Sequence, residues 1–274
     1  MRIDAHQHFW RYSEKEYPWI PKNSPLHRDW LPDDLSPLLK QCPLDGSIAV
    51  QARQSLEESR WLLELARDHP IIRGVVGWVD LQSPSVSQSL RELSTNPKFV
   101  GVRHVAQDEP DRFLVGPKFV AGIAQLEEFN LAYDLLIYPR QMRAAIELVG
   151  KFPRQRFVLD HLAKPPIARG LLSPWRENIL ELARFPNVSC KISGLVTEAD
   201  HQSWQPENFT PYLDVVLEAF GEDRLMFGSD WPVCLLAAEY AAVFRLIENY
   251  TAKLSPSTRA KIFGDNAARF YKLT

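Results

Sequence analysis

The sequence of 274 residues lacks an excess of charge of either sign. Lys and Arg together number 32, Asp and Glu number 34, and the formal net charge is -2. A basic surplus is what draws a protein to nucleic acid or to an anionic membrane surface. The balanced charge therefore gives no support to either class of binding protein, and we expect neither nucleic acid nor membrane as a partner.

Cysteines are few, and long apolar runs are missing. The three cysteines, Cys42, Cys190 and Cys234, are an odd number without CxxC spacing, which argues against a disulfide framework or a structural zinc knot. No stretch of the sequence reaches the ~18 apolar residues that a membrane span needs. The first residues show no basic region followed by an apolar one, so we see no secretory signal. Together these absences predict a cytoplasmic protein.

Short apolar segments rich in β-branched residues are what the sequence does contain. Eight of them read as strands, namely 2–9, 47–52, 74–80, 99–105, 131–138, 156–160, 187–193 and 224–230. Most of the intervening stretches have apolar residues at helical spacing. The stretch 55–70 is an example, with Ser55 as the expected N-cap and Pro70 as the expected stop.

Strands that alternate with helices predict parallel βα units, and eight such units close into a (β/α)8 TIM barrel. We expect one domain over residues 1–274, because no linker or low-complexity tract divides the chain. A doubly wound open sheet is disfavoured because no GxGxxG follows the first strand. The segment 10–37 holds five prolines and three tryptophans and is expected to be a long loop over the barrel mouth.

Ionisable residues gather where the predicted strands end, which is where a barrel carries its chemistry. His6 and His8 share a face of the first strand by alternation, together with Asp4. His161 ends the sixth strand and Asp230 ends the eighth. A single strand histidine is usually just a hydrogen-bonded core residue. The coincidence of three imidazoles and one carboxylate is more specific, because it makes an N₃O set suited to one Zn²⁺ with an open position.

At these residues the sequence resembles the amidohydrolase superfamily, in particular its sugar-acid lactonase branch of L-fuconolactonase-like and L-rhamnonolactonase-like proteins. The motifs that carry the resemblance run along the chain: DAHQHFW, YPWI, LPDDL, GVRH, YDLLIYP, DHLAKP, CKISGL, FGSDWP and IFGDNAARFY. The family's metal ligands fall on His6, His8, His161 and Asp230. Lys191 stands where binuclear members have a further histidine, so a two-metal site is not expected. The resemblance implies either one divalent metal ion, Zn²⁺, or catalysis without a metal.

The resemblance implies hydrolysis of an aldonolactone, such as L-fuconolactone or L-rhamnonolactone, to the open acid in carbohydrate catabolism. Asp230 would activate the attacking water, and His161 would share the catalytic role. The expected substrate-binding residues are Arg103, His104, Tyr138, Lys164, Lys191, Trp30 and Trp231. Both tryptophans are candidates for stacking on the sugar ring.

Three other activities remain open at this point. A metal-dependent nonoxidative decarboxylase and a pyrone dicarboxylate lactonase use the same barrel, and the second would suit a Lys164 that contacts a carboxylate. A non-catalytic sugar-acid binding barrel is disfavoured, because a binding module has no need of a poised base. The sequence also leaves open whether two copies form a homodimer.

Overall fold

The computed structural model describes residues 1–273, and these contain an eight-stranded parallel sheet in which the strands follow chain order. The strands are β1 (Ile3–Gln7), β2 (Gly46–Val50), β3 (Ile72–Gly77), β4 (Phe99–His104), β5 (Ala132–Leu135), β6 (Phe157–Leu159), β7 (Val188–Ile192) and β8 (Leu225–Phe227). The sheet closes where the amide of Asp230 donates to the carbonyl of His6 and the amide of His8 donates to that of Trp231. The predicted barrel is confirmed, and each strand lies within, or within two residues of, a predicted segment.

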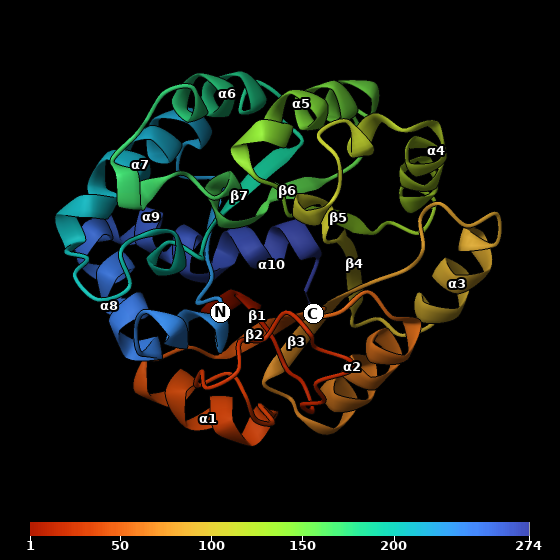
Figure 1. Ribbon diagram of the computed structural model, residues 1–274, viewed down its shortest axis with the longest axis horizontal. Helices are drawn as coiled ribbons and strands as arrows, with labels where there is room; N and C mark the ends of the chain where they lie inside the picture. Colours follow the sequence, from red (N-terminus) through yellow and green to blue (C-terminus); the bar gives the residue numbers. More distant parts are fainter. Residues whose placement is uncertain (274) are drawn as a thin grey trace.

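Helices surround the barrel in a ring (Figure 1). They are α1 (Pro32–Gln41), α2 (Leu56–Asp68), α3 (Val86–Leu93), α4 (Pro117–Leu126), α5 (Met142–Lys151), α6 (Trp175–Leu182), α7 (Pro206–Phe220), α8 (Tyr240–Thr251), α9 (Pro256–Ala260) and α10 (Asn266–Tyr271). The expected cap of α2 is present, since the Ser55 side chain accepts from the amide of Glu58 and the helix ends before Pro70. None of the helices in residues 1–273 has the length and apolar character of a membrane span.

The loop after β1 is shorter than the predicted loop over residues 10–37. It is irregular as far as Leu31, but α1 begins at Pro32 and includes Pro37, so the prediction of a loop over 32–37 was wrong. Proline at the first helical position needs no amide partner, and the Asp34 side chain accepts from the amide of Leu31. An isolated bridge between Trp10 and Trp30 ties the two ends of the remaining loop together.

Strand β1 contains an irregularity that the alternation argument could not foresee. The pairing register between β1 and β2 shifts between Asp4 and Gln7. Asp4 therefore does not share a face with His6. Its carboxylate accepts from the hydroxyls of Ser229 and Tyr240, the latter on the outer helix α8.

The hydrophobic core has two parts. The larger lies between the sheet and the helices, and the smaller fills the barrel interior with side chains such as Ile48, Val76 and Val158. Tyr271 and Ala267 of α10 belong to the interior cluster, and Figure 1 shows α10 lying across the barrel behind the strands. The apolar filling leaves the carboxyl ends of the strands to polar side chains.

Candidate active site

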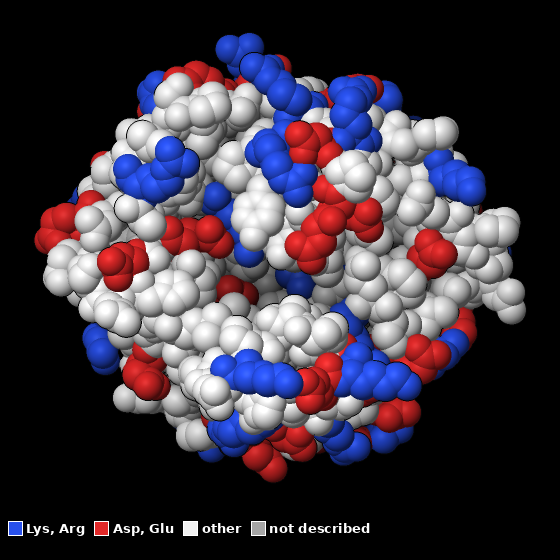
Figure 2. Space-filling view, viewed as in Figure 1, with Lys and Arg blue, Asp and Glu red and all other residues white. Residues whose placement is uncertain are grey.

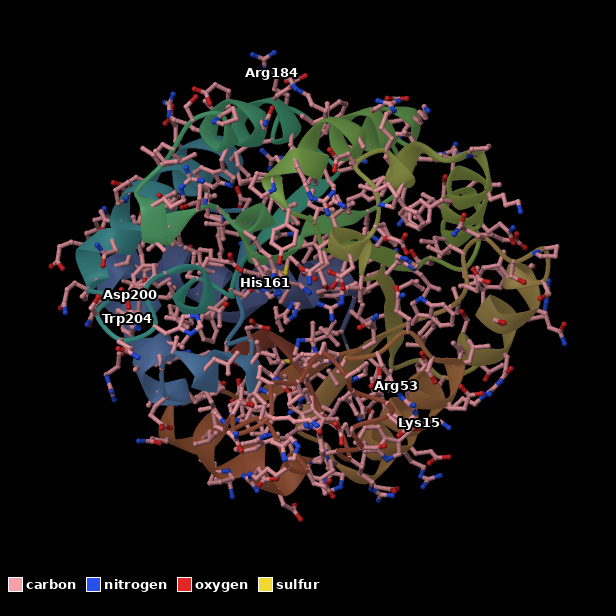
Figure 3. All side chains as sticks on the ribbon, in the orientation of Figure 1. Lys15, Arg53, His161, Arg184, Asp200 and Trp204 are labelled. Carbon is pink, nitrogen blue, oxygen red and sulfur yellow. The ribbon has the colours of Figure 1, made fainter. Side chains whose placement is uncertain are left out.

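A cavity of about 510 Å³ lies at the carboxyl ends of the strands. Its lining includes His8 after β1, Arg53 after β2, Arg103 on β4, and His161 and Asp230 after β6 and β8. Figure 2 shows a hollow at the centre of the ring of helices, with side chains of both charges around it. Figure 3 places His161 near that centre and Arg53 nearer the rim. The residues at the predicted strand ends therefore meet in one cavity.

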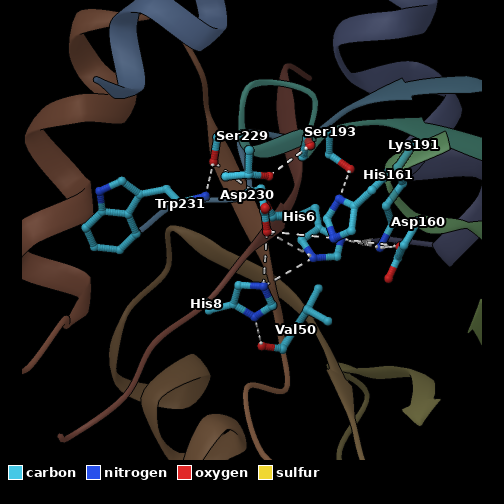
Figure 4. Close-up of polar contacts among 12 residues, drawn as sticks. His6, His8, Val50, Asp160, His161, Lys191, Ser193, Ser229, Asp230 and Trp231 are labelled. Atoms are coloured by element: carbon cyan, nitrogen blue, oxygen red, sulfur yellow. Dashed lines mark hydrogen bonds and ion pairs between the residues drawn. The ribbon is translucent and has the colours of Figure 1, made fainter. Parts of the chain in front are cut away.

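Three imidazoles surround one oxygen of Asp230 (Figure 4). The Nε2 atoms of His6, His8 and His161 lie 3.7, 3.4 and 3.8 Å from Asp230 Oδ1. All four residues are at least 95% buried. The structure thus brings together the whole set that the sequence singled out.

The opposite ring nitrogens of these histidines are held by fixed partners. His8 Nδ1 lies 2.8 Å from the carbonyl oxygen of Val50, which can only accept, so this nitrogen carries a proton. His161 Nδ1 lies 2.9 Å from Ser193 Oγ, and His6 Nδ1 lies 3.3 Å from Asp160 Oδ1. These contacts direct the Nε2 atoms towards Asp230.

Burial controls the protonation of the site. It lowers the pKa of His6 well below its usual value and that of His161 to about 4, so both rings are neutral near pH 7. Burial alone would raise the pKa of Asp230, but the histidines that face it outweigh that effect and hold the pKa below its ordinary range. Asp230 is therefore an ionised carboxylate that faces three imidazole nitrogens.

This donor set fits a divalent cation. Atoms of His6, His161 and Asp230 that could bind a metal all lie within 4.8 Å of one another, and His8 Nε2 is 3.3 Å from His6 Nε2. Neutral imidazole and carboxylate are the ligands that Zn²⁺ takes in catalytic sites. One group competes for the same space, since Arg103 Nη1 lies 3.3 Å from His6 Nε2.

Below the histidines lies a fully buried charge network. Lys191 Nζ is 2.5 Å from Asp134 and 3.0 Å from Asp160, and Arg103 Nη1 is 3.2 Å from Asp160. Two cations thus balance two carboxylates, which offsets the cost of burying them. The hydroxyl of Tyr271 on α10 also donates to Asp134. Lys191 forms its ion pairs within this network, is fully buried and does not line the cavity. Its prediction as a substrate-binding residue was wrong.

The other expected substrate-binding residues divide into two groups. Arg103 and Lys164 line the cavity. His104 does not, because it points away from the barrel axis, stacks on Phe113 and lies 3.1 Å from Glu109. Tyr138 is also absent from the lining, and its ring lies 5.3 Å from Lys164 Nζ.

The expectation for the two tryptophans needs correction. Trp231 is fully buried and Trp30 is 8% exposed, and their rings pack edge to face at 5.1 Å outside the cavity lining. Neither can stack on a sugar without unpacking the core. Trp19, which is 44% exposed, lines the cavity instead. The sequence argument missed it, although it lies in the loop expected over the mouth.

The backbone at the site is strained. Residues His161–Lys164 have consecutive φ values of 53, 53, 56 and 52°, a left-handed turn built without glycine, and Asp230 has φ of 58°. Each such residue costs of the order of 1–3 kcal/mol and persists where the surroundings enforce it. The indole of Trp175 donates to the carbonyl of Leu162 at 2.6 Å and helps to hold the turn. The turn aims His161 and Lys164 into the same cavity.

Sequence reasoning also missed Glu198 and Asp160. Glu198 follows β7 and lines the cavity, where its carboxylate lies 3.5 Å from Lys164 Nζ. Burial raises the pKa of Glu198, and the Lys164 ammonium opposes that rise. Asp160 directly precedes His161 in the sequence, and that adjacency was the available signal for it.

Comparisons with known proteins identify the family of this chain. The sequence profile of the amidohydrolase family matches residues 3–273. The chain is 43% identical to an L-fucono-1,5-lactonase of Burkholderia multivorans, covering 100% of this chain and 96% of the relative. It is 39% identical to an L-fucono-1,5-lactonase of Burkholderia ambifaria, covering 99% and 96%. A crystal structure of an amidohydrolase from B. multivorans with bound Zn superposes with a TM-score of 0.96 at 44% identity, covering 100% of both chains.

Proposed function

We propose, because this chain belongs to the amidohydrolase family, that it is a hydrolase which opens a sugar-acid lactone to the free acid. The observation that carries this function is the ionised carboxylate of Asp230 at the bottom of a cavity, faced by three imidazole nitrogens. The near full-length likeness to two L-fucono-1,5-lactonases supports an aldonolactone as the substrate.

The chemistry follows from the position of Asp230. Its carboxylate accepts a proton from water while the water oxygen attacks the lactone carbonyl carbon. The tetrahedral intermediate then collapses, the bond from the carbonyl carbon to the ring oxygen breaks, and Asp230 returns the proton to that oxygen. His161, which is neutral near pH 7 and held by Ser193, serves to orient the reacting groups.

We propose that His6, His8, His161 and Asp230 hold one Zn²⁺. When bound, the ion would polarise the lactone carbonyl and lower the pKa of water, which compensates for the low basicity of Asp230. The alternative is catalysis without metal, in which Arg103 and Lys164 supply the positive charge for the developing oxyanion. Metal analysis of the purified protein and activity after chelation and zinc return separate the two.

The test of the function is a panel of lactones followed with a pH indicator, because lactone opening releases acid. We expect turnover of L-fucono-1,5-lactone and of related neutral aldonolactones. Turnover of pyrone dicarboxylate lactone alone would favour the dicarboxylate alternative. Release of CO₂ from an aromatic acid, with no lactone opened, would make the protein a decarboxylase. Binding of sugar acids without any turnover would revive the binding barrel.

We further propose that the reaction belongs to carbohydrate catabolism in the cytoplasm. Cys42, Cys190 and Cys234 are free thiols and all are buried, which supports a reducing compartment.

A further inference from the structure

Two ion pairs stand in the wall of the cavity. Arg53 Nη1 lies 2.6 Å from Glu16 Oε1, and Lys164 Nζ lies 3.5 Å from Glu198 Oε1. The second pair is the more enclosed, with side chains 18 and 20% exposed. It joins the left-handed turn after β6 to the loop after β7, next to His161.

The Lys164–Glu198 pair keeps its hydrogen-bonding capacity. Lys164 Nζ and Glu198 Oε1 lie 3.5 Å apart, which is long for a hydrogen bond, so the contact between them is weak. An ammonium offers three donors and a carboxylate accepts at two oxygens. A vicinal diol presents donors and acceptors at a matching separation, so the pair suits a hydroxylated ligand.

The charges of the cavity lining also favour an uncharged ligand. The lining contains three cations, Arg53, Arg103 and Lys164, and each faces a carboxylate, namely Glu16, Asp160 (which Arg103 shares with Lys191) and Glu198. Asp108 and Asp230 add two further carboxylates. A ligand carboxylate entering this cavity would therefore meet cations that are already neutralised, and like charges beside them.

We propose that Glu198 is a specificity-determining residue: by neutralising Lys164 it selects uncharged, hydroxylated lactones against lactones that carry a carboxylate, while the pair binds the hydroxyls of the substrate. The inference rests on the lactonase function proposed above. It also resolves the two roles open to Lys164 in favour of a hydroxyl contact.

The experiment compares kcat/KM for a neutral aldonolactone and for an aldarolactone, which has the same type of ring with a free carboxylate. Both substrates are measured on one preparation of each variant, so that metal content cancels in the ratio. We expect wild type to prefer the neutral lactone. Glu198→Gln should leave Lys164 uncompensated and shift the ratio at least tenfold towards the aldarolactone.

A second variant keeps the test sharp if Glu198→Gln folds poorly. Lys164→Met leaves the Glu198 carboxylate unpaired, so the ratio should move in the opposite direction and KM for the neutral lactone should rise. The double variant should return to the wild-type preference but keep the raised KM, because the charge is balanced again and the hydroxyl contacts are gone. Glu181→Gln, which removes the same charge from an exposed pair with Arg143, is the matched control and should leave the ratio unchanged.

Binding of the corresponding lactams, measured by calorimetry, separates this inference from the proposed function. Lactams resist hydrolysis, so their Kd ratio reports selectivity even if the lactones are not turned over. If no lactone is opened but the Kd ratio shifts as described, the function fails and the inference stands. If the ratios of Glu198→Gln and Lys164→Met stay within twofold of wild type, as in the control, the inference is overturned.

Discussion

Asp230 has a left-handed backbone conformation, and its carboxylate is surrounded by histidines. Its φ is 58°, its amide donates to the carbonyl of His6, and its carboxylate meets three imidazoles. The hydrogen bond to His6 joins β8 to β1, so the strained residue sits where the barrel closes. Closure of the barrel and placement of the proposed base are therefore the same structural event.

Replacing Asp230 by Asn should lower kcat/KM for the lactone by about 10²–10⁴-fold, because the amide cannot take the proton from water. The isosteric change should leave the far-UV circular dichroism and the fold intact. Asp68→Asn, in an exposed pair with Arg67, is the control and should keep full activity. Near wild-type turnover by Asp230→Asn would contradict the assigned role.

Gly194 is a residue whose lack of a side chain the site requires. Its φ is +61°, and a Cβ there would lie 2.5 Å from His161 Nδ1. Gly194→Ala should displace His161 and reduce kcat/KM by at least tenfold. Gly170 has nearly the same φ, +64°, but nothing lies within 4 Å of its Cβ position. Gly170→Ala should therefore lower only the free energy of unfolding, by about 1 kcal/mol, and equal losses of activity in the two variants would refute the steric argument.

The sequence could predict those site residues that stand at the ends of strands. His6, His8, His161 and Asp230 were found because each stands at a strand end, and strand ends converge in a barrel. Trp30 and Trp231 were misassigned because a tryptophan's identity does not reveal whether it packs in the core or lines a cavity. Glu198 was missed because its partner, Lys164, is 34 positions away in sequence and reaches it through a left-handed turn.

At the scale of elements, Glu58 on α2 fastens the loop after β1 to the loop after β2. Its carboxylate accepts from the hydroxyl of Tyr17 and from the amides of Ala52 and Arg53. Burial raises the pKa of Glu58 to about 7, against the partly compensating hydrogen bonds. Both loops contribute to the cavity lining, so the hydrogen bonds of Glu58 hold together two parts of the cavity wall.

The raised pKa of Glu58 predicts a pH dependence of stability. The folded state holds the proton more tightly than the unfolded chain, whose glutamate titrates near 4.5. The contribution of Glu58 to the free energy of unfolding is therefore present below pH 4.5 and falls as the pH rises to about 7, by roughly 3 kcal/mol at most.

Glu58→Gln removes this titration and keeps an acceptor for the two amides. In urea denaturation at pH 5 and pH 8, we expect the stability of Glu58→Gln relative to wild type to be greater at pH 8. Glu64→Gln on the exposed side of the same helix should show no such difference. A relative stability that is the same at both pH values would contradict the raised pKa.

The eight strands were predictable because parallel strands buried on both faces are rich in apolar residues, and β6 and β8 are apolar throughout. The details of β1 and of the turn after β6 were not. The register shift after Asp4 and the positive φ of His161–Lys164 arise from tertiary packing, and no glycine marks either place. Local patterns identify elements, whereas the departures from regular geometry that aim the side chains are set by contacts between elements.

At the scale of the molecule, the buried charges run as a chain from the floor of the barrel to its mouth. Tyr271 on α10 donates to Asp134, which pairs with Lys191, which pairs with Asp160 beneath His6. Tyr271→Phe removes a hydrogen bond to a carboxylate and should destabilise the protein by roughly 1.5–3 kcal/mol. Tyr250→Phe, whose hydroxyl contacts the exposed Asp214, should cost less than about 1 kcal/mol.

Chemical denaturation of both tyrosine variants gives the comparison. We expect the kcat/KM of Tyr271→Phe to remain within a few-fold of wild type, because Lys191 still holds Asp134 and Asp160. Equal stability losses for the two variants would show that the buried hydroxyl contributes no more than an exposed one.

The same chain of contacts has a consequence for biosynthesis. Asp134 and Tyr271 are separated by 137 positions, and Asp4 and Ser229 by 225. While α10 is still inside the ribosome, the nascent chain lacks the Tyr271 hydroxyl that donates to Asp134 and the side chains that α10 adds to the barrel interior. Chains that lack β8 would in addition have open sheet edges, and we expect the protein to acquire its site only after translation has passed α10, in a single late folding step.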